Sequence, residues 1–153
     1  MSITVSFSGR CGFLNKVNRD YFRALVKRLS HTNGVNDVNL NYIFLSDEEL
    51  LEINREHLQH DYYTDIITFD LSESALEVFG ELYISKDRIK DHAKKYQVSE
   101  EEELIRVMSH GFLHLIGFND KSEAEVIMMR KEEERCLSLW REIKNVSRET
   151  ITI

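Results

Sequence analysis

Three S-x-x-E sequences that are followed by apolar residues at helical spacing constrain the fold most, because each marks the first turn of a helix. They are Ser46 with Glu49, Ser99 with Glu102, and Ser122 with Glu125. In this capping box, the serine hydroxyl and the glutamate carboxylate each accept a hydrogen bond from a backbone N–H that the helix leaves unpaired. Apolar residues at helical spacing follow each box, which predicts helices over 46–58, 101–116 and 123–140.

Helix and strand patterns alternate along the rest of the chain. Residues 16–30 repeat apolar side chains at helical spacing, and Ser85 can cap a helix over 86–96. Alternating apolar and polar residues predict strands at 3–7, 37–45, 65–69 and 81–85. About four strands and five helices indicate an α+β fold with a mixed sheet. A three-layer α/β/α variant is the alternative.

The composition fits one folded unit, and we expect residues 1–153 to form a single domain. The sequence has no proline, no Gly/Ser-rich linker and no apolar run near the roughly 20 residues that span a bilayer. The first residues lack the basic and apolar segments of a signal peptide, and the two cysteines form no CxxC pair. These features predict a cytoplasmic protein with free thiols and no membrane partner.

The stretch HGFLHLIGFND, residues 110–120, carries a candidate metal site. His110 and His114 are four residues apart, so on a helix both imidazoles lie on one face and can reach one ion. Gly117 lets the helix end and the chain turn back, which brings Asp120 into reach as a third ligand. Three such ligands suit Zn²⁺ and leave a fourth position for water. A buried, hydrogen-bonded histidine pair is the alternative on spacing alone.

The residue after the first histidine argues against a zinc protease. In the HExxH motif of those enzymes this position is a glutamate that serves as general base, whereas here it is Gly111. Glycine cannot accept a proton, so peptide hydrolysis by that mechanism lacks its base.

Three segments resemble one known family in the same order along the chain. HGFLHLIGFND is similar to the signature HGxLHLxGYDH of the YbeY family. YYTDIITFD at 62–70 is similar to its PTDVLSFP segment, and GELYIS at 80–85 to its GDIxIS strand. Order and spacing agree across residues 53–120. Members of this family are bacterial zinc-dependent endoribonucleases implicated in ribosomal RNA maturation.

The resemblance implies roles for individual residues. By position, His110 and His114 match the first two metal ligands, and Asp120 stands where the family usually has a third histidine. Thr64 and Asp65 match the family's TD pair. A carboxylate at position 65 can fix the tautomer of a ligand histidine, and it can equally cap the start of a strand.

The chain departs from the family pattern just before the TD pair. The usual arginine, six residues before the threonine, is Leu58 here, so its role on substrate phosphate does not transfer. Arg55, one helical turn earlier, and His60 are the candidate stand-ins, with Arg55 the first choice for stabilising charge on the phosphate. Arg55 can equally pair with nearby glutamates. Tyr63 replaces the usual proline, which lowers the rigidity of the turn.

The resemblance also implies a function. It implies hydrolysis of single-stranded RNA with one zinc ion per chain, with His114, Arg55 and Asp65 as catalytic residues. The expected role is maturation of the 3′ end of 16S ribosomal RNA and ribosome quality control. The expected partners are ribosomal RNA and the small ribosomal subunit, not DNA. Two alternatives stay open: a zinc hydrolase of a non-RNA substrate, and a ribosome assembly factor with weak or no nuclease activity.

The net charge of −7 means that RNA contact needs local positive charge. Two stripes at helical spacing are candidates, and each can equally be a solvated helix face. They are Lys16, Arg19, Arg23 and Lys27, and then Lys86, Lys90 and Lys94. The acidic stretch 100–103 is predicted at a helix N-terminus, where the macrodipole favours it. The acidic stretch 132–134 is predicted as a solvated helix surface.

Overall fold

The computed structural model describes residues 2–12 and 14–152, with side chains as far as residue 146. The strands are β1 (Ser2–Ser8), β2 (Asp37–Leu45), β3 (Ile66–Asp70) and β4 (Glu77–Ser85). The helices are α1 (Lys16–Thr32), α2 (Asp47–Leu58), α3 (Lys86–Tyr96), α4 (Glu100–Leu115) and α5 (Glu123–Thr152). These five helices and four strands confirm the α+β prediction for the described part of the chain.

Two elements are longer than predicted by four residues or more. Helix α5 runs to Thr152, although its predicted end was residue 140, because no glycine or proline follows Trp140 to stop it. Lys144 in this extension pairs with Glu101 of α4 at 3.0 Å. Strand β4 begins at Glu77, four residues earlier than predicted, because the alternation of buried and partly exposed residues already starts there.

The four strands form one mixed sheet in the order β1-β2-β4-β3. Strands β1 and β2 are parallel, as are β2 and β4, whereas β3 runs antiparallel to β4. Thr68 of β3 lies opposite Leu82 of β4, which in turn lies opposite Tyr42 of β2. The antiparallel strand is therefore at an edge of the sheet, where it can form the wall of a cavity.

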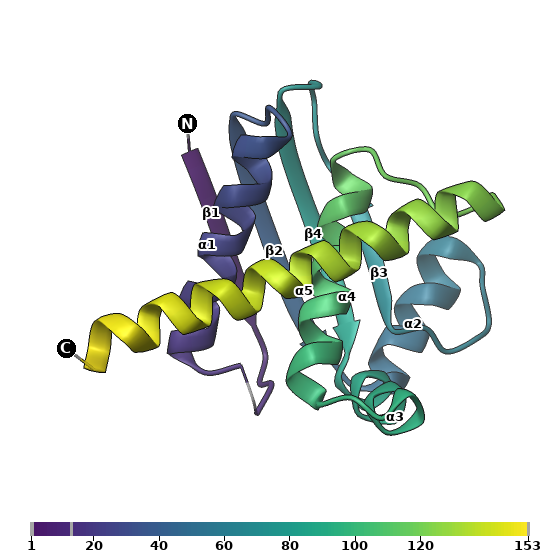
Figure 1. Cartoon of the computed structure of the whole chain (residues 1–153). Coiled ribbons are helices and arrows are strands. Elements are labelled where there is room, and N and C mark those ends of the chain that lie inside the picture. The colour runs from purple at the N-terminus through teal and green to yellow at the C-terminus, as the bar shows by residue number, and fades with distance from the viewer. Residues whose placement is uncertain (1, 13, 153) are drawn as a thin grey trace.

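Helices α1 and α4 cover one face of the sheet, and the long helix α5 crosses over both of them (Figure 1). The covered face is apolar, and in β2 it presents Val38, Leu40, Tyr42 and Phe44. The other face of β2 presents Asn39 and Asn41, which are partly exposed. Helix α2 lies beside the β3 edge, where the ring of His57 is 6.0 Å from that of Phe69.

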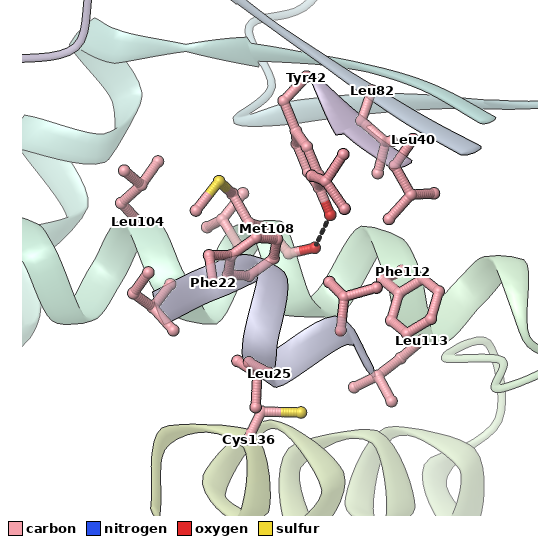
Figure 2. Close-up of a cluster of buried hydrophobic side chains, with 14 of the residues drawn as sticks. Phe22, Leu25, Leu40, Tyr42, Leu82, Leu104, Met108, Phe112, Leu113 and Cys136 are labelled. Atoms are coloured by element: carbon pink, nitrogen blue, oxygen red, sulfur yellow. Dashed lines mark hydrogen bonds between the residues drawn. The ribbon is translucent and has the colours of Figure 1, made fainter. Parts of the chain in front are cut away.

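The core between the sheet and α4 also contains one buried polar contact (Figure 2). The Tyr42 hydroxyl donates a hydrogen bond of 2.8 Å to the Met108 carbonyl, so this buried oxygen has a partner. Leu25, Phe112 and Cys136 pack into the same cluster from three helices. The contact fixes α4 against the sheet two residues before His110.

Two glycines let α4 approach the sheet closely. A Cβ atom at Gly111 would lie 2.5 Å from Leu82 Cδ2 and 2.8 Å from Ile66 Cδ1. At Gly80 of β4 it would lie 2.5 Å from Leu115 Cδ1. Because real side chains do not approach so closely, a larger residue at either position would have to displace these leucine or isoleucine side chains or move the helix away from the sheet. The close packing places the end of α4 directly beside β3.

The three predicted capping boxes start helices as expected, but only two are complete. Ser46 and Glu49 exchange both hydrogen bonds, and so do Ser122 and Glu125. Ser99 accepts from the Glu102 amide at 3.0 Å, whereas the Glu102 carboxylate pairs with Arg141 of α5. Within the described residues, no helix is both long and apolar enough to cross a membrane.

Candidate metal centre

The end of α4 turns the chain back over its own last turn. Gly117 has a φ of 111°, which glycine adopts without the steric cost that other residues meet. Its amide donates to the His114 carbonyl, and the next amide, of Phe118, donates to the Leu113 carbonyl. This pair of bonds is a Schellman motif. It confirms the predicted helix end at Gly117 and directs the following residues back towards the two histidines.

The turn brings His110, His114 and Asp120 together, and we call these residues the ligand triad. The Nε2 atoms of the two histidines are 3.0 Å apart. Asp120 Oδ2 lies 3.4 Å from His110 Nε2 and 3.3 Å from His114 Nε2. The three residues form a group that could hold a metal ion. All three are partly exposed, so solvent or a substrate can reach the group.

The spacing of these three atoms fits zinc. Ligands about 2.0–2.1 Å from a tetrahedral ion are separated from one another by about 3.3 Å. The observed separations of 3.0 to 3.4 Å match that value without movement of the backbone. Two imidazole nitrogens and one carboxylate oxygen are also a donor set that zinc accepts.

Glu133 of α5 holds His110 from the other side. Its Oε2 lies 2.7 Å from His110 Nδ1. Since an ionised carboxylate only accepts hydrogen bonds, Nδ1 carries the hydrogen and a neutral ring presents the lone pair of Nε2 to the triad. This is the tautomer that a metal ligand needs, and carboxylate partners of this kind orient ligand histidines. The prediction that 132–134 is a solvated surface is therefore wrong for Glu133, which is 5% exposed.

Arg106 links Glu133 to a second buried carboxylate, that of Glu103. Its guanidinium donates to both side chains, at 2.9 Å to Glu133. We call Glu103, Arg106 and Glu133 the buried network. Burial alone would raise the pKa of Glu133, but hydrogen bonds from His110 and Arg106 outweigh it and hold that pKa below its ordinary value. Glu133 is thus ionised and can accept from His110.

Glu103 belongs to an acidic stretch that was predicted only to favour the helix macrodipole. It is 1% exposed and faces Arg106, so its charge is neutralised by an ion pair rather than by water. Burial would lower the pKa of Arg106, and the two carboxylates raise it above its usual value instead. The stretch therefore contributes one residue to the buried network.

A cavity of about 540 Å³ opens beside the ligand triad. Its wall is built by the end of α2, the loop after it, strand β3 and the end of α4. Asp65 lines this cavity with the triad, and so does Leu58, which stands in place of the family's arginine. His60, one candidate stand-in for that arginine, also lines it.

The other two predicted catalytic residues lie differently. The Asp65 carboxylate is 3.8 Å from His92 Nδ1, and the carboxylate that bonds a triad histidine is that of Glu133. Arg55 is not among the residues that line the cavity, and it pairs with Asp61 on the surface at 2.6 Å. The structure thus brings Asp65 to the triad's cavity and leaves Arg55 outside its wall.

The two basic stripes lie away from the triad. Helix α3, which carries Lys86, Lys90 and Lys94, packs beside the first turns of α4, whereas the triad is at that helix's far end (Figure 1). In α1, the guanidinium groups of Arg19 and Arg23 stack over the ring of Phe7. Arg23 also pairs with Asp20. These contacts occupy part of the stripe with other residues of the chain.

Comparisons with known proteins agree with this geometry. Residues 13–141 match the model of the family described as Endoribonuclease YbeY. A relative of that name from Cytophaga hutchinsonii is 53% identical over 102 residues, which are 67% of this chain and 71% of the relative. One from Parabacteroides distasonis is 45% identical over 114 residues, 74% of this chain and 80% of the relative.

A solved structure supports the fold as well. The solution structure of a Thermotoga maritima protein is similar with a TM-score of 0.61 and 26% identity, over 91% of this chain and 93% of that one. The family match includes the ligand triad, Asp65 and Glu133. On these grounds the chain belongs to the YbeY family of endoribonucleases.

Proposed function

We propose that residues 1–153 form a single zinc-dependent endoribonuclease domain that acts on ribosomal RNA. The observation that carries this proposal is the ligand triad, whose donor atoms are spaced for zinc and open to a cavity. Membership of the YbeY family supports the reaction class, hydrolysis of an RNA phosphodiester. Gly111, which cannot act as a base, argues against the protease chemistry of other zinc sites on helices.

The side chains of the site would have different roles around one zinc ion. His110, His114 and Asp120 would hold the metal, and Glu133 keeps the His110 ring in the required tautomer. Zinc bound there would lower the pKa of water and polarise a phosphoryl oxygen. Asp65 is positioned on the same cavity wall to orient substrate or to accept a proton. Arg55 would contact a phosphate only after leaving Asp61.

The substrate is proposed more narrowly as single-stranded ribosomal RNA. The site would act near the 3′ end of 16S ribosomal RNA, during maturation and quality control of the small ribosomal subunit in the cytoplasm. Incubation of purified precursor subunits with the zinc-loaded protein tests this proposal. The expected result is a new 3′ end. Cleavage of free RNA but not of these particles would argue against the subunit as the partner.

Loss of one triad residue tests the metal. His114→Ala is expected to remain folded and to lose both bound zinc and RNA cleavage, because two ligands hold zinc far less well than three. Elemental analysis and cleavage of a single-stranded oligoribonucleotide measure the two losses. His31→Ala, an exposed histidine on α1, is the matched control. A folded His114→Ala protein with unchanged zinc content would refute the site.

Asp120 is tested by two substitutions with opposite outcomes. Asp120→Ala should lose zinc, whereas Asp120→His should retain it, because imidazole also binds zinc and is the family's usual ligand at this position. Equal zinc affinity in Asp120→Ala and the parent would remove Asp120 from the triad. The assembly-factor alternative makes a different prediction: His114→Ala would then lose zinc and still support maturation of the subunit.

A further inference from the structure

The cavity beside the ligand triad offers little positive charge to a nucleic acid. Among the described residues, those that line it include no lysine and no arginine, while Asp65, Asp70 and Asp120 contribute carboxylates. Phosphate contacts normally supply much of the affinity for RNA. If the site acts on RNA, as proposed above, contacts other than cation–phosphate pairs must hold the strand in this cavity.

Two aromatic side chains on the cavity wall can provide such contacts. The rings of His60 and Tyr62 stack with centroids 5.2 Å apart and an interplanar angle of 22°. The Tyr62 hydroxyl is 2.9 Å from His60 Nδ1, which links the two rings at their edges. Tyr62 is 57% exposed although both residues line the cavity. An exposed aromatic side chain next to the candidate metal site is accessible to a ligand ring.

The loop that carries this pair is fixed from below by Asn54, which is 1% exposed. The Asn54 side-chain amide donates to the Tyr62 carbonyl at 2.9 Å, and the Asn54 main-chain carbonyl accepts from the His60 amide at 3.2 Å. Arg55 adds an ion pair to Asp61 in the middle of the loop. Because the loop is already ordered by these bonds, a ligand that stacks on Tyr62 does not have to order it.

The neighbouring tyrosine shows that this arrangement is particular to position 62. Tyr63 is also exposed, but its hydroxyl donates to Glu48 and the guanidinium of Arg88 lies over its ring. It does not line the cavity. One of the two adjacent tyrosines is therefore tied to α2 and α3, while the other stands at the cavity beside the triad.

We propose that His60 and Tyr62 form a stacking platform for an unpaired nucleobase of the RNA strand whose phosphodiester lies at the ligand triad. Stacking on an aromatic side chain tolerates every base, because each base has a π face. Stacking requires a base that is not paired within a double helix, so the platform selects single-stranded RNA. The carboxylates of the cavity wall repel the phosphates of the strand, so a strand whose base is not stacked on the platform binds less well.

The test compares binding of a short single-stranded oligoribonucleotide by zinc-loaded variants, measured by fluorescence anisotropy. Tyr62→Leu should weaken binding about tenfold, since it removes one stacked base contact. Tyr62→Phe keeps the ring and should bind like the parent. Tyr63→Leu is the matched control and should also bind like the parent. Circular dichroism and zinc content confirm that each variant is folded and loaded.

A second measurement assigns the loss to the base. A set of RNA strands is compared, each with one abasic nucleotide at a different position. The parent should bind one of these strands more weakly than the others. Tyr62→Leu should bind all of them with equal affinity. If the parent cleaves RNA and Tyr62→Leu binds as well as the parent, the platform alone is overturned. If the parent neither binds nor cleaves RNA, the platform and the proposed function fall together.

Discussion

The two sides of the His110 ring differ in almost every physical respect. On the Nε2 side, His114 and Asp120 are partly exposed, come from the same short segment and border a cavity. On the Nδ1 side, Glu133 and Arg106 form a largely buried network between the consecutive helices α5 and α4, from residues 27 positions apart. One side is open for ligand exchange, and the other is closed to fix a tautomer.

This difference separates two requirements of a metal site. The open side presents the donor atoms of the candidate metal site, and their loss should change metal binding more than folding. The closed side contains buried charges, each of which is neutralised by a partner. Removal of one partner should therefore lower the stability of the fold before it changes metal binding. The following experiments test that separation in order of decreasing effect.

Arg106→Leu should have the largest effect on stability. It leaves the carboxylates of Glu103 and Glu133 buried without their cation, which should lower the free energy of unfolding by about 3–5 kcal/mol. Urea denaturation measures the loss. Arg135→Leu, an exposed arginine on α5 paired with Glu132, should change stability by no more than about 0.5 kcal/mol. Similar losses in both variants would show that the network is not a structural unit.

Glu133→Gln should weaken zinc without abolishing its binding. The amide oxygen can still accept from His110, but the negative charge that strengthens the ligand is lost. We expect affinity to fall by about 10- to 100-fold, measured by competition with a chelator. Glu134→Gln, the exposed neighbour, is the control and should bind zinc like the parent. Unchanged affinity in Glu133→Gln would confine this carboxylate to a role in folding.

Gly111→Ala tests the face of α4 that packs against the sheet. The added methyl group must displace Leu82 or Ile66 from a close-packed core, at an expected cost of about 1–3 kcal/mol in unfolding free energy. Gly12→Ala provides the comparison, because no atom beyond the residue and its chain neighbours lies within 4 Å of a Cβ at that position. A Gly111→Ala protein as stable as the parent would mean that α4 can move outward without loss.

The smallest effect concerns the thiol on the closed side. Burial raises the pKa of Cys136 to about 12 and that of Cys11 to about 11, so each is a protonated thiol at neutral pH. Neither should react with a thiol reagent at about pH 8 in the folded protein, and both should react once it is denatured. Rapid labelling of Cys136 in the native state would show that the closed side opens.

The local features of this site could be predicted from the sequence. The capping serines are followed by helices because a cap and its partner are three residues apart. His110, His114 and Asp120 lie within eleven residues, so helix geometry and one glycine turn bring them together. The loop conformation that pairs Arg55 with Asp61 had no comparable pattern, because Arg55 also had glutamates within reach on its own helix.

Glu133 was missed because three consecutive glutamates look like a solvated surface. Its partner His110 is 23 residues away on another helix, and that packing is not visible locally. A signal did exist. Glu133 shares a helical face with Met129, Cys136 and Trp140, all of which are buried. A charged residue inside an apolar stripe is a candidate for a buried pair.

The contact of Gly111 with the sheet has an evolutionary consequence. Substitution of Gly111 by glutamate would complete HExxH in the sequence, at residues 110–114. That side chain would begin in the space of Leu82 and Ile66, so the mutant would lose packing before it gained a base. A glutamate at this position therefore also requires Leu82 of β4 and Ile66 of β3 to move. One substitution at position 111 does not by itself open the route to a helix-borne zinc protease.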